Sequence, residues 1–331
     1  MSELRQDPVT HDWVIINPQR AQRPGHNEAT APICPFCRGN ESLAPAATDT
    51  IAGPAGEWLV RAVPNRYPAL STDEGVPVTH EHTAEGWHRL VGFGRHEVII
   101  ETAEHEASLA SMGREQVYRV LEMYLRRYRA LSEADGLARQ IVLFRNQGRR
   151  AGTSLTHPHS QIIATPVVSP EMRWRLAEEI EFFDASGRCG VCHVLAQELE
   201  TSSRVIKISE HFVTLAPFAS RVPYHIQLIP RRHLPIFSGV EAAELKDLAD
   251  HLTTVLGALH RVLLTPSYNL VVVTPPLDQT HQHANHWFID VLPRLTIPAG
   301  FELGSRIVVN AMLPEQAAAE LRAHLSGADC A

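Results

Sequence analysis

The chain has 331 residues, of which 44% are hydrophobic and 20% are charged, and its formal net charge is −7. This composition is that of a globular protein long enough for two domains. The negative charge argues against a general nucleic-acid surface, and no apolar run approaches the roughly 18 residues that a membrane helix needs.

The first chemical signal along the chain is a pair of cysteines, Cys34 and Cys37, spaced as CxxC. A second pair with the same spacing is formed by Cys189 and Cys192, and the fifth cysteine, Cys330, stands alone near the end. Each pair offers two thiolates to one tetrahedral zinc ion. Disulfides and a thioredoxin-like redox pair are the alternatives. Because no apolar leader segment opens the chain, we expect a reducing, cytoplasmic setting and metal binding.

The segment from Thr156 to Gln161 is the most informative stretch, because it places two histidines around a proline. In an extended strand, side chains at i and i+2 point to the same face. His157, His159 and Gln161 should therefore share one face, and Ser160 should lie on the other. An imidazole is a good nucleophile and a common metal ligand, so this face suits attack on a phosphoryl group.

Four helices are expected from the spacing of apolar residues. Residues 115–128 carry a stripe at 117, 120, 121, 124, 125 and 128, and 242–263 carry a leucine stripe. Residues 170–183 should join the two halves, and 314–325 should form a final helix with a proline near its start.

The two halves repeat the same order of parts. Each has a cysteine pair, a strand that ends at a proline, an Arg-His pair beside an apolar run, a long helix and a strand that carries histidines. In the first half His96 precedes the apolar run, and His233 matches it in the second half. Four matches in one order favour duplication, with one metal site in each half. The predicted fold is α+β, with halves at residues 1–168 and 169–331.

Together these motifs resemble the galactose-1-phosphate uridylyltransferases and their relatives, the transferase branch of the histidine-triad superfamily. The resemblance covers nearly the whole chain and rests on residues 20–24, 34–37, 64–65, 96–98, Asn146 and 152–161. It implies a duplicated half-barrel fold, with antiparallel sheets and flanking helices, that forms a homodimer. It also implies a role in carbohydrate metabolism, in particular galactose metabolism.

The resemblance further implies a nucleotidyltransferase that works in two steps. His159 attacks the α-phosphorus of a nucleotide sugar, sugar 1-phosphate leaves, and a second phosphate takes the nucleotide from the histidine. Gln161 resembles the residue that donates to the transferring phosphate. We expect the substrate-binding set to be Arg20, Arg23, Asn65, Asn146, Ser154, Ser160 and Arg306.

The same resemblance and the internal symmetry assign two zinc sites per chain. The first set is Cys34, Cys37, His96 and His157. The second set is Cys189, Cys192, His233 and His286, with His193, His225, His281 and His283 as nearby competitors. Phe288 stands where His159 stands in the first half, so the second half should keep the metal and lack the nucleophile.

The chain departs from the galactose-specific pattern near its C-terminus. Galactose-specific members carry Gly-Tyr-Glu, whereas this chain has Gly304, Ser305 and Arg306. A cation at this position favours an anionic acceptor over a plain sugar, and the alternative is that Arg306 simply points to solvent. An ADP-sugar phosphorylase or adenylyltransferase, a nucleotide-sugar hydrolase and a zinc-stabilised nucleotide-binding protein therefore remain as alternatives.

Overall fold

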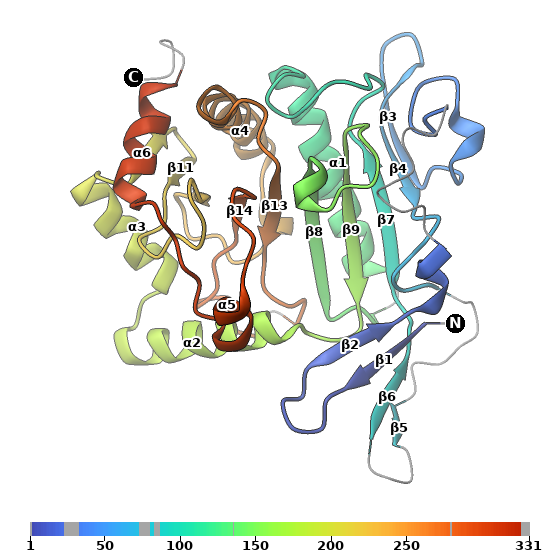
Figure 1. Ribbon diagram of the computed structural model, residues 1–331, viewed down its shortest axis with the longest axis horizontal. Helices are drawn as coiled ribbons and strands as arrows, with labels where there is room; N and C mark the ends of the chain where they lie inside the picture. Colours follow the sequence, from blue (N-terminus) through green and yellow to red (C-terminus); the bar gives the residue numbers. More distant parts are fainter. Residues whose placement is uncertain are drawn as a thin grey trace.

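Figure 1 shows the computed structural model of the protein, which describes residues 2–22, 33–72, 80–82, 87–134, 136–278 and 280–325. The strands are β1 (Glu3–Gln6), β2 (Trp13–Ile16), β3 (Asp49–Ala52), β4 (Trp58–Pro64), β5 (His80–His82), β6 (His88–Val91), β7 (Arg95–Ile100), β8 (Gln140–Gln147), β9 (His159–Thr165), β10 (Val205–Ile208), β11 (Phe212–Leu215), β12 (Ile226–Pro230), β13 (Tyr268–Val273) and β14 (Phe288–Pro293). The α-helices are α1 (Arg114–Glu133), α2 (Pro170–Ser186), α3 (Gly190–Thr201), α4 (Ala242–Leu263), α5 (Gly300–Ser305) and α6 (Pro314–Ala323), and the 3-10 helices are η1 (Pro18–Gln22), η2 (Glu41–Leu43), η3 (Arg149–Ala151) and η4 (Phe237–Gly239).

A ten-stranded sheet forms the centre of the molecule, in the order β10-β11-β12-β14-β13-β8-β9-β7-β4-β3. Every neighbouring pair in it is antiparallel. Five strands come from each half of the chain, and the halves meet where β13 pairs with β8. A smaller four-stranded sheet, β2-β1-β6-β5, projects from one corner (Figure 1). The predicted α+β class with antiparallel sheets is confirmed.

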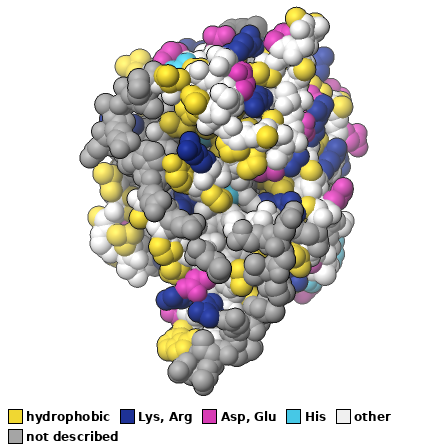
Figure 2. All heavy atoms as spheres, turned by 90° about the vertical axis from the view of Figure 1, so that its right-hand side faces the viewer, with side chains coloured by type: hydrophobic (Ala, Val, Ile, Leu, Met, Phe, Trp, Pro, Cys, Tyr) yellow, Lys and Arg dark blue, Asp and Glu magenta, His cyan; other side chains and the backbone are white. Residues whose placement is uncertain are grey.

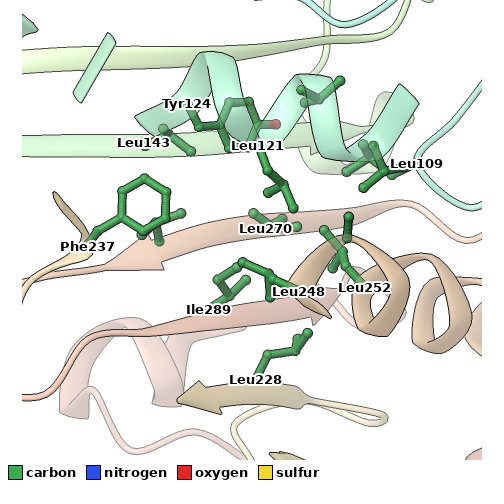
Figure 3. Close-up of a cluster of buried hydrophobic side chains, with 14 of the residues drawn as sticks. Leu109, Leu121, Tyr124, Leu143, Leu228, Phe237, Leu248, Leu252, Leu270 and Ile289 are labelled. Atoms are coloured by element: carbon green, nitrogen blue, oxygen red, sulfur yellow. The ribbon is translucent and has the colours of Figure 1, made fainter. Parts of the chain in front are cut away.

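Helices α1 and α4 cover one face of the large sheet and enclose the main core. The stripe expected on α1 is buried, and Leu121 and Tyr124 pack with Leu143 of β8. Leu248 and Leu252 of α4 meet Leu270 and Ile289 in the same core, as Figure 3 shows. Each fully buried leucine contributes about 1.5–3 kcal/mol. Hence these amphipathic helices fix which sheet face points inward and which stays available for a site.

The other face of the sheet is partly covered by α2 and α3. Helix α2 begins where the sequence places it: Ser169 caps it by accepting from the Met172 N–H at 3.3 Å, and Pro170 occupies its first position. It ends at Gly187, whose φ is +68°. On α3, Leu195 packs against Phe288 in a second, smaller core. In the first half of the chain, most of this face of the sheet is not covered by α2 or α3.

The expected helices differ from the observed ones only at their ends. Helix α4 has the expected bounds, 242–263, whereas α1 runs to Glu133 and α2 to Ser186. Helix α6 ends at Ala323. The division between residues 168 and 169 falls at the cap of α2, and it stays a prediction because the two halves share one continuous sheet.

The surface carries charges of both signs. Figure 2 shows the side of the molecule at the right of Figure 1, where basic and acidic side chains are interspersed with hydrophobic ones.

Among the helices of the described residues, none is both long and apolar enough to cross a membrane.

Candidate functional site

The central residue of the site is His159, the first residue of β9. Its side chain is 7% exposed and lies on the sheet face opposite α1. The Nδ1–H donates to the carbonyl oxygen of His157 at 2.8 Å, which leaves Nε2 with its lone pair. Burial lowers the pKa of His159, so the ring is neutral near pH 7. A neutral, oriented imidazole is what nucleophilic attack requires.

Gln161 lies two residues further along the same face and is held by His96. The backbone N–H of Ala69 donates to Nδ1 of His96 at 3.0 Å. Consequently Nε2 of His96 carries the proton and donates to Oε1 of Gln161 at 2.9 Å. Asn65 also donates to this oxygen, at 3.5 Å. Because the oxygen of Gln161 is occupied, its NH2 group is the part that can donate to a ligand.

The first cysteine pair belongs to a cluster of Cys34, Cys37, His105 and His157, whose ligand atoms all lie within 4.8 Å of one another. Nδ1 of His157 is 3.7 Å from the Cys34 sulfur and 3.6 Å from that of Cys37, and Nδ1 of His105 is 3.2 Å from the latter. The other nitrogen of His157 donates to the carbonyl of Thr102 at 2.8 Å. Such outer contacts are typical of metal-bound histidines. The donor set fits a tetrahedral metal ion.

The assignment of His96 to this metal site was wrong. Both of its nitrogens are taken by Ala69 and Gln161, and His105 occupies the fourth position of the cluster. The sequence contained a signal for His105, because it follows the end of β7 as His233 follows the end of β12. His96 lies within β7 instead, so its match with His233 was the error.

The second cluster unites Cys189, Cys192, His233 and His286 within 4.8 Å. Nδ1 of His233 and Nδ1 of His286 lie 3.5 and 3.3 Å from the Cys192 sulfur. The other nitrogen of His233 donates to the carbonyl of Gln282 at 3.0 Å. These are the residues expected by symmetry, and they too can hold a metal ion. The competitors His193, His225, His281 and His283 are not members of this cluster.

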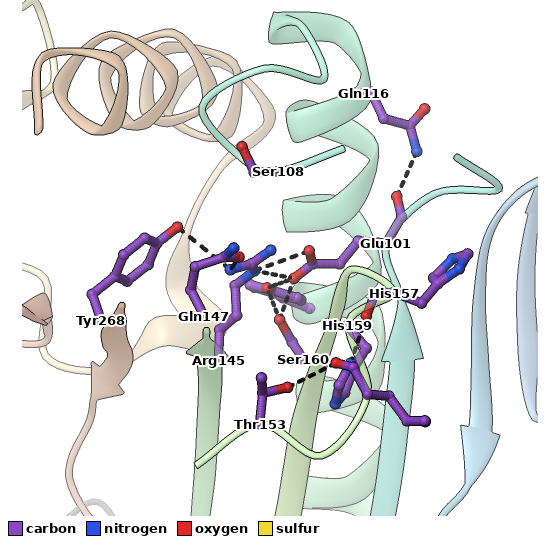
Figure 4. Close-up of polar contacts among 12 residues, drawn as sticks. Glu101, Ser108, Gln116, Arg145, Gln147, Thr153, His157, His159, Ser160 and Tyr268 are labelled. Carbon is purple, nitrogen blue, oxygen red and sulfur yellow. Dashed lines mark hydrogen bonds and ion pairs between the residues drawn. The ribbon is translucent and has the colours of Figure 1, made fainter. Parts of the chain in front are cut away.

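A buried ionic network lies behind β9, on the α1 side. Arg145 donates from Nε to both oxygens of Glu101, at 2.9 and 3.0 Å, and the two side chains are 1% and 0% exposed. Tyr124 donates to Glu101 at 3.1 Å, and Ser160 donates to the same carboxylate. The backbone N–H of Glu101 donates to the Pro158 carbonyl at 3.1 Å. Figure 4 shows this network beside His159.

The assignment of Ser160 to substrate binding was therefore wrong. Its side chain is 1% exposed and points toward Glu101 and Tyr124, on the face opposite His159. The alternation of a strand requires this, since Ser160 stands between His159 and Gln161.

The remaining residues expected to bind substrate are distributed around the site. Asn146 lies on β8 and accepts from Asn269 at 2.8 Å, and Ser154 lies in the loop that precedes β9. Arg20 on η1 donates to the Tyr67 carbonyl at 3.2 Å, close in sequence to Asn65. Arg23 lies outside the described residues.

Arg306 lies apart from these groups at the end of α5. Its side chain is 79% exposed and forms an ion pair with Asp12 at 3.6 Å. None of its described contacts is with His159 or Gln161. A substrate could therefore contact Arg306 only on the exposed surface of the chain.

Comparison with known proteins decides the family. Residues 1–169 match the family described as galactose-1-phosphate uridyl transferase, N-terminal domain. The chain belongs to this family. An ADP-glucose phosphorylase of Arabidopsis thaliana is 34% identical over 330 residues, which cover 97% of this chain and 92% of the relative. A galactose-1-phosphate uridylyltransferase of Thermotoga maritima is 29% identical over 330 residues, which cover 97% of this chain and 98% of that one.

Solved structures of the same family share the fold. The crystal structure of the Arabidopsis ADP-glucose phosphorylase with bound ADP-glucose matches with a TM-score of 0.79 at 34% identity, over 97% of this chain and 98% of that one. A uridylyltransferase structure matches with a TM-score of 0.81 at 29% identity, with the same coverage. The resemblance seen in the sequence is thereby confirmed.

Proposed function

We propose that the protein transfers a nucleoside monophosphate from a nucleotide sugar to a phosphate acceptor through a covalent intermediate on His159. The observation that carries the proposal is the orientation of this ring. Its Nδ1–H is bound to the His157 carbonyl at 2.8 Å, and Nε2 shares a sheet face with Gln161. A module that only bound nucleotides would need no such nucleophile.

The reaction balances over two displacements. In the first, Nε2 of His159 forms a bond to the α-phosphorus, and the bond from this phosphorus to the oxygen of the sugar 1-phosphate breaks. In the second, a phosphate oxygen of the acceptor bonds to the phosphorus, and the N–P bond breaks. The NH2 group of Gln161 donates to the oxygen on which charge develops. Asn65, Asn146, Ser154, Arg20 and Arg23 are proposed to hold the nucleotide and the phosphates.

We propose zinc for the two clusters, which gives two ions per chain. Sets of two cysteines and two histidines form closed structural sites, so the metal supports the fold and takes no part in the displacement. The four described cysteines form no disulfide with one another, and thiolate ligands require reducing conditions. These conditions favour a cytoplasmic location.

A homodimer is proposed from an exposed apolar segment around α5. Residues 295–313 expose eight large hydrophobic side chains, Leu295, Ile297, Phe301, Leu303, Ile307, Val308, Val309 and Leu313. Side chains of this kind on a protein surface mark an interaction site. If a second copy covered this segment, Arg306 would lie close to the contact between the two copies.

The test of the covalent step is His159→Asn. Wild-type protein incubated with UDP-glucose or ADP-glucose should gain the mass of one nucleoside monophosphate, and His159→Asn should gain none because it lacks the nucleophile. His324→Asn, which alters an exposed histidine, is the control and should be labelled normally. Exchange of labelled sugar 1-phosphate into nucleotide sugar separates a transferase from a hydrolase. Mass gained by His159→Asn at another residue would contradict the proposal.

The acceptor is proposed to be inorganic phosphate or an anionic sugar phosphate, with an ADP-sugar as the second candidate donor. Arg306 supports this, since arginine has five donors and no acceptor for sugar hydroxyls. The similarity to an ADP-glucose phosphorylase supports the same choice. We expect poor uridylyl transfer from UDP-glucose to galactose 1-phosphate and improvement by Arg306→Glu, measured as initial rates. Efficient transfer by the unmodified protein would contradict this proposal and show that galactose 1-phosphate is an acceptor.

A further inference from the structure

The second half of the chain contains a counterpart of the proposed active site. In the first half Gln161 pairs in register with Val98 of β7 and Phe144 of β8. In the second half Asp290 pairs with Gln227 of β12 and Val271 of β13. Asp290 therefore occupies the position of Gln161, and Phe288 occupies that of His159.

The hydrogen bonds around this position are repeated as well. Nε2 of His225 donates to Asp290 at 3.1 Å, as His96 does to Gln161 at 2.9 Å. The N–H of Arg221 donates to Nδ1 of His225 at 3.3 Å, as that of Ala69 does to His96. In both halves a histidine of the metal cluster also lies two residues before the first residue of the strand. These histidines are His157, before His159 of β9, and His286, before Phe288 of β14. Hence the second half keeps the frame of a site, with Phe288 in place of the nucleophile and Asp290 in place of the amide.

A cavity of about 300 Å³ lies at this second position, between the sheet and α2. Val271 and Val273 of β13 line one wall, and Met172 of α2 also lines the cavity. Its volume is at the lower end for small-molecule sites, and its walls combine apolar side chains with a few polar groups, as such sites do.

The polar groups of the cavity suit a ribonucleotide. The Asp290 side chain is 3% exposed and accepts from His225, Gln227 and Arg221, and a carboxylate has room for a fourth donor such as a ribose hydroxyl. Arg221 and Arg175, the latter in an ion pair of 3.7 Å with Glu179, are the guanidinium groups that can meet a phosphate. The pair of Arg221 with Glu171 is 3.5 Å long between partly exposed side chains, so a phosphate can displace it.

We infer that this cavity binds a ribonucleoside 5′-phosphate without reacting with it. The base would lie between the valines and Met172, the ribose on Asp290, and the phosphate on Arg175 and Arg221. No transfer can follow, because the ring of Phe288 has no lone pair with which to attack phosphorus. The guanidinium of Arg175 lies 5.0 Å from the centre of this ring. The choice of ligand class rests on the proposed function, since it follows from the counterpart position.

The experiment counts bound nucleotide by equilibrium dialysis with AMP and, separately, with UMP. Neither probe has a sugar-phosphate leaving group, so binding is read without turnover. Val271→Phe should fill the cavity and bind one equivalent fewer than wild type. Val194→Phe is the matched control on the exposed surface of α3 and should bind as wild type does. Arg221→Gln, which leaves the cavity open, should bind about tenfold more weakly at this site.

The outcomes separate this inference from the proposed function, because covalent labelling of His159 is measured on the same variants. Equal binding by wild type, Val271→Phe and Val194→Phe overturns the second site, whatever the labelling shows. A lost equivalent in Val271→Phe supports the second site even if His159 is never labelled, in which case the transfer proposal fails alone. If Val271→Phe is misfolded by circular dichroism, Arg221→Gln decides, and unchanged affinity overturns the inference.

Discussion

His96 and His105 show how two histidines nine residues apart acquire different tasks. His96 is inside β7, where the alternation of the strand aims it at Gln161. His105 follows the strand, where the chain is able to turn toward Cys37. One histidine therefore orients the amide that is proposed to take part in catalysis, and the other completes a cluster that can hold a metal ion.

This difference gives a prediction for metal content. His105→Ala should lower the zinc from about two to about one ion per chain, because three ligands remain where a closed site needs four. His96→Ala should keep both ions and instead reduce labelling of His159, because Gln161 loses its partner. Elemental analysis of protein purified without chelator measures both. Loss of an ion in His96→Ala with retention in His105→Ala would reverse the assignment.

At the scale of elements, the Glu101–Arg145 pair joins the chain after β7 to strand β8. Glu101 also accepts from Tyr124 of α1 and from Ser160 of β9. The charged pair is buried at the centre of four elements, and its bonds to Pro158 and Ser160 hold the start of β9. The position of His159 thus depends on contacts made on the far side of its own strand.

Removing one member of this pair should destabilise the fold strongly. Glu101→Met leaves the buried charge of Arg145 uncompensated, and we expect a loss of about 3–5 kcal/mol in the free energy of unfolding measured with urea. Glu101→Met combined with Arg145→Met should recover most of this loss. Glu122→Met is the control, because its pair with Arg126 is more exposed and is worth less than about 1 kcal/mol. Equal losses from Glu101→Met and Glu122→Met would refute the role of the network.

At the scale of the whole molecule, one sheet carries both halves, while the α5 segment remains uncovered. Phe301 and Leu303 are 60% and 74% exposed, and Arg306 follows directly. If a second copy covers this segment, the dimer buries these side chains and places Arg306 near the contact between subunits.

Phe301→Asp should therefore weaken the dimer. A buried aromatic anchor is worth about 2 kcal/mol or more, which corresponds to a roughly thirtyfold higher dissociation constant in sedimentation equilibrium. Val194→Asp changes an exposed valine on α3 and should leave the association unchanged. A wild-type chain that sediments as a monomer at all concentrations would exclude this interface.

The sequence by itself determined what depends on local spacing. The apolar stripe placed α4 at its observed bounds, Ser169 and Pro170 marked the start of α2, and the alternation of residues put His159 and Gln161 on one face. These features follow from the periods of helix and strand, which need only neighbouring residues.

Tertiary structure decided what depends on register between distant strands. The pairing of β7 with β9 places His96 where it can hydrogen-bond to Gln161. The packing of α1 brings Tyr124 and Glu101 into one hydrogen-bonded network with Ser160. The hydrogen bond between His225 and Asp290, which repeats the one between His96 and Gln161, also emerged only from the tertiary structure. A shift of one residue in such a pairing exchanges the faces of a strand, and spacing along the chain does not fix that shift.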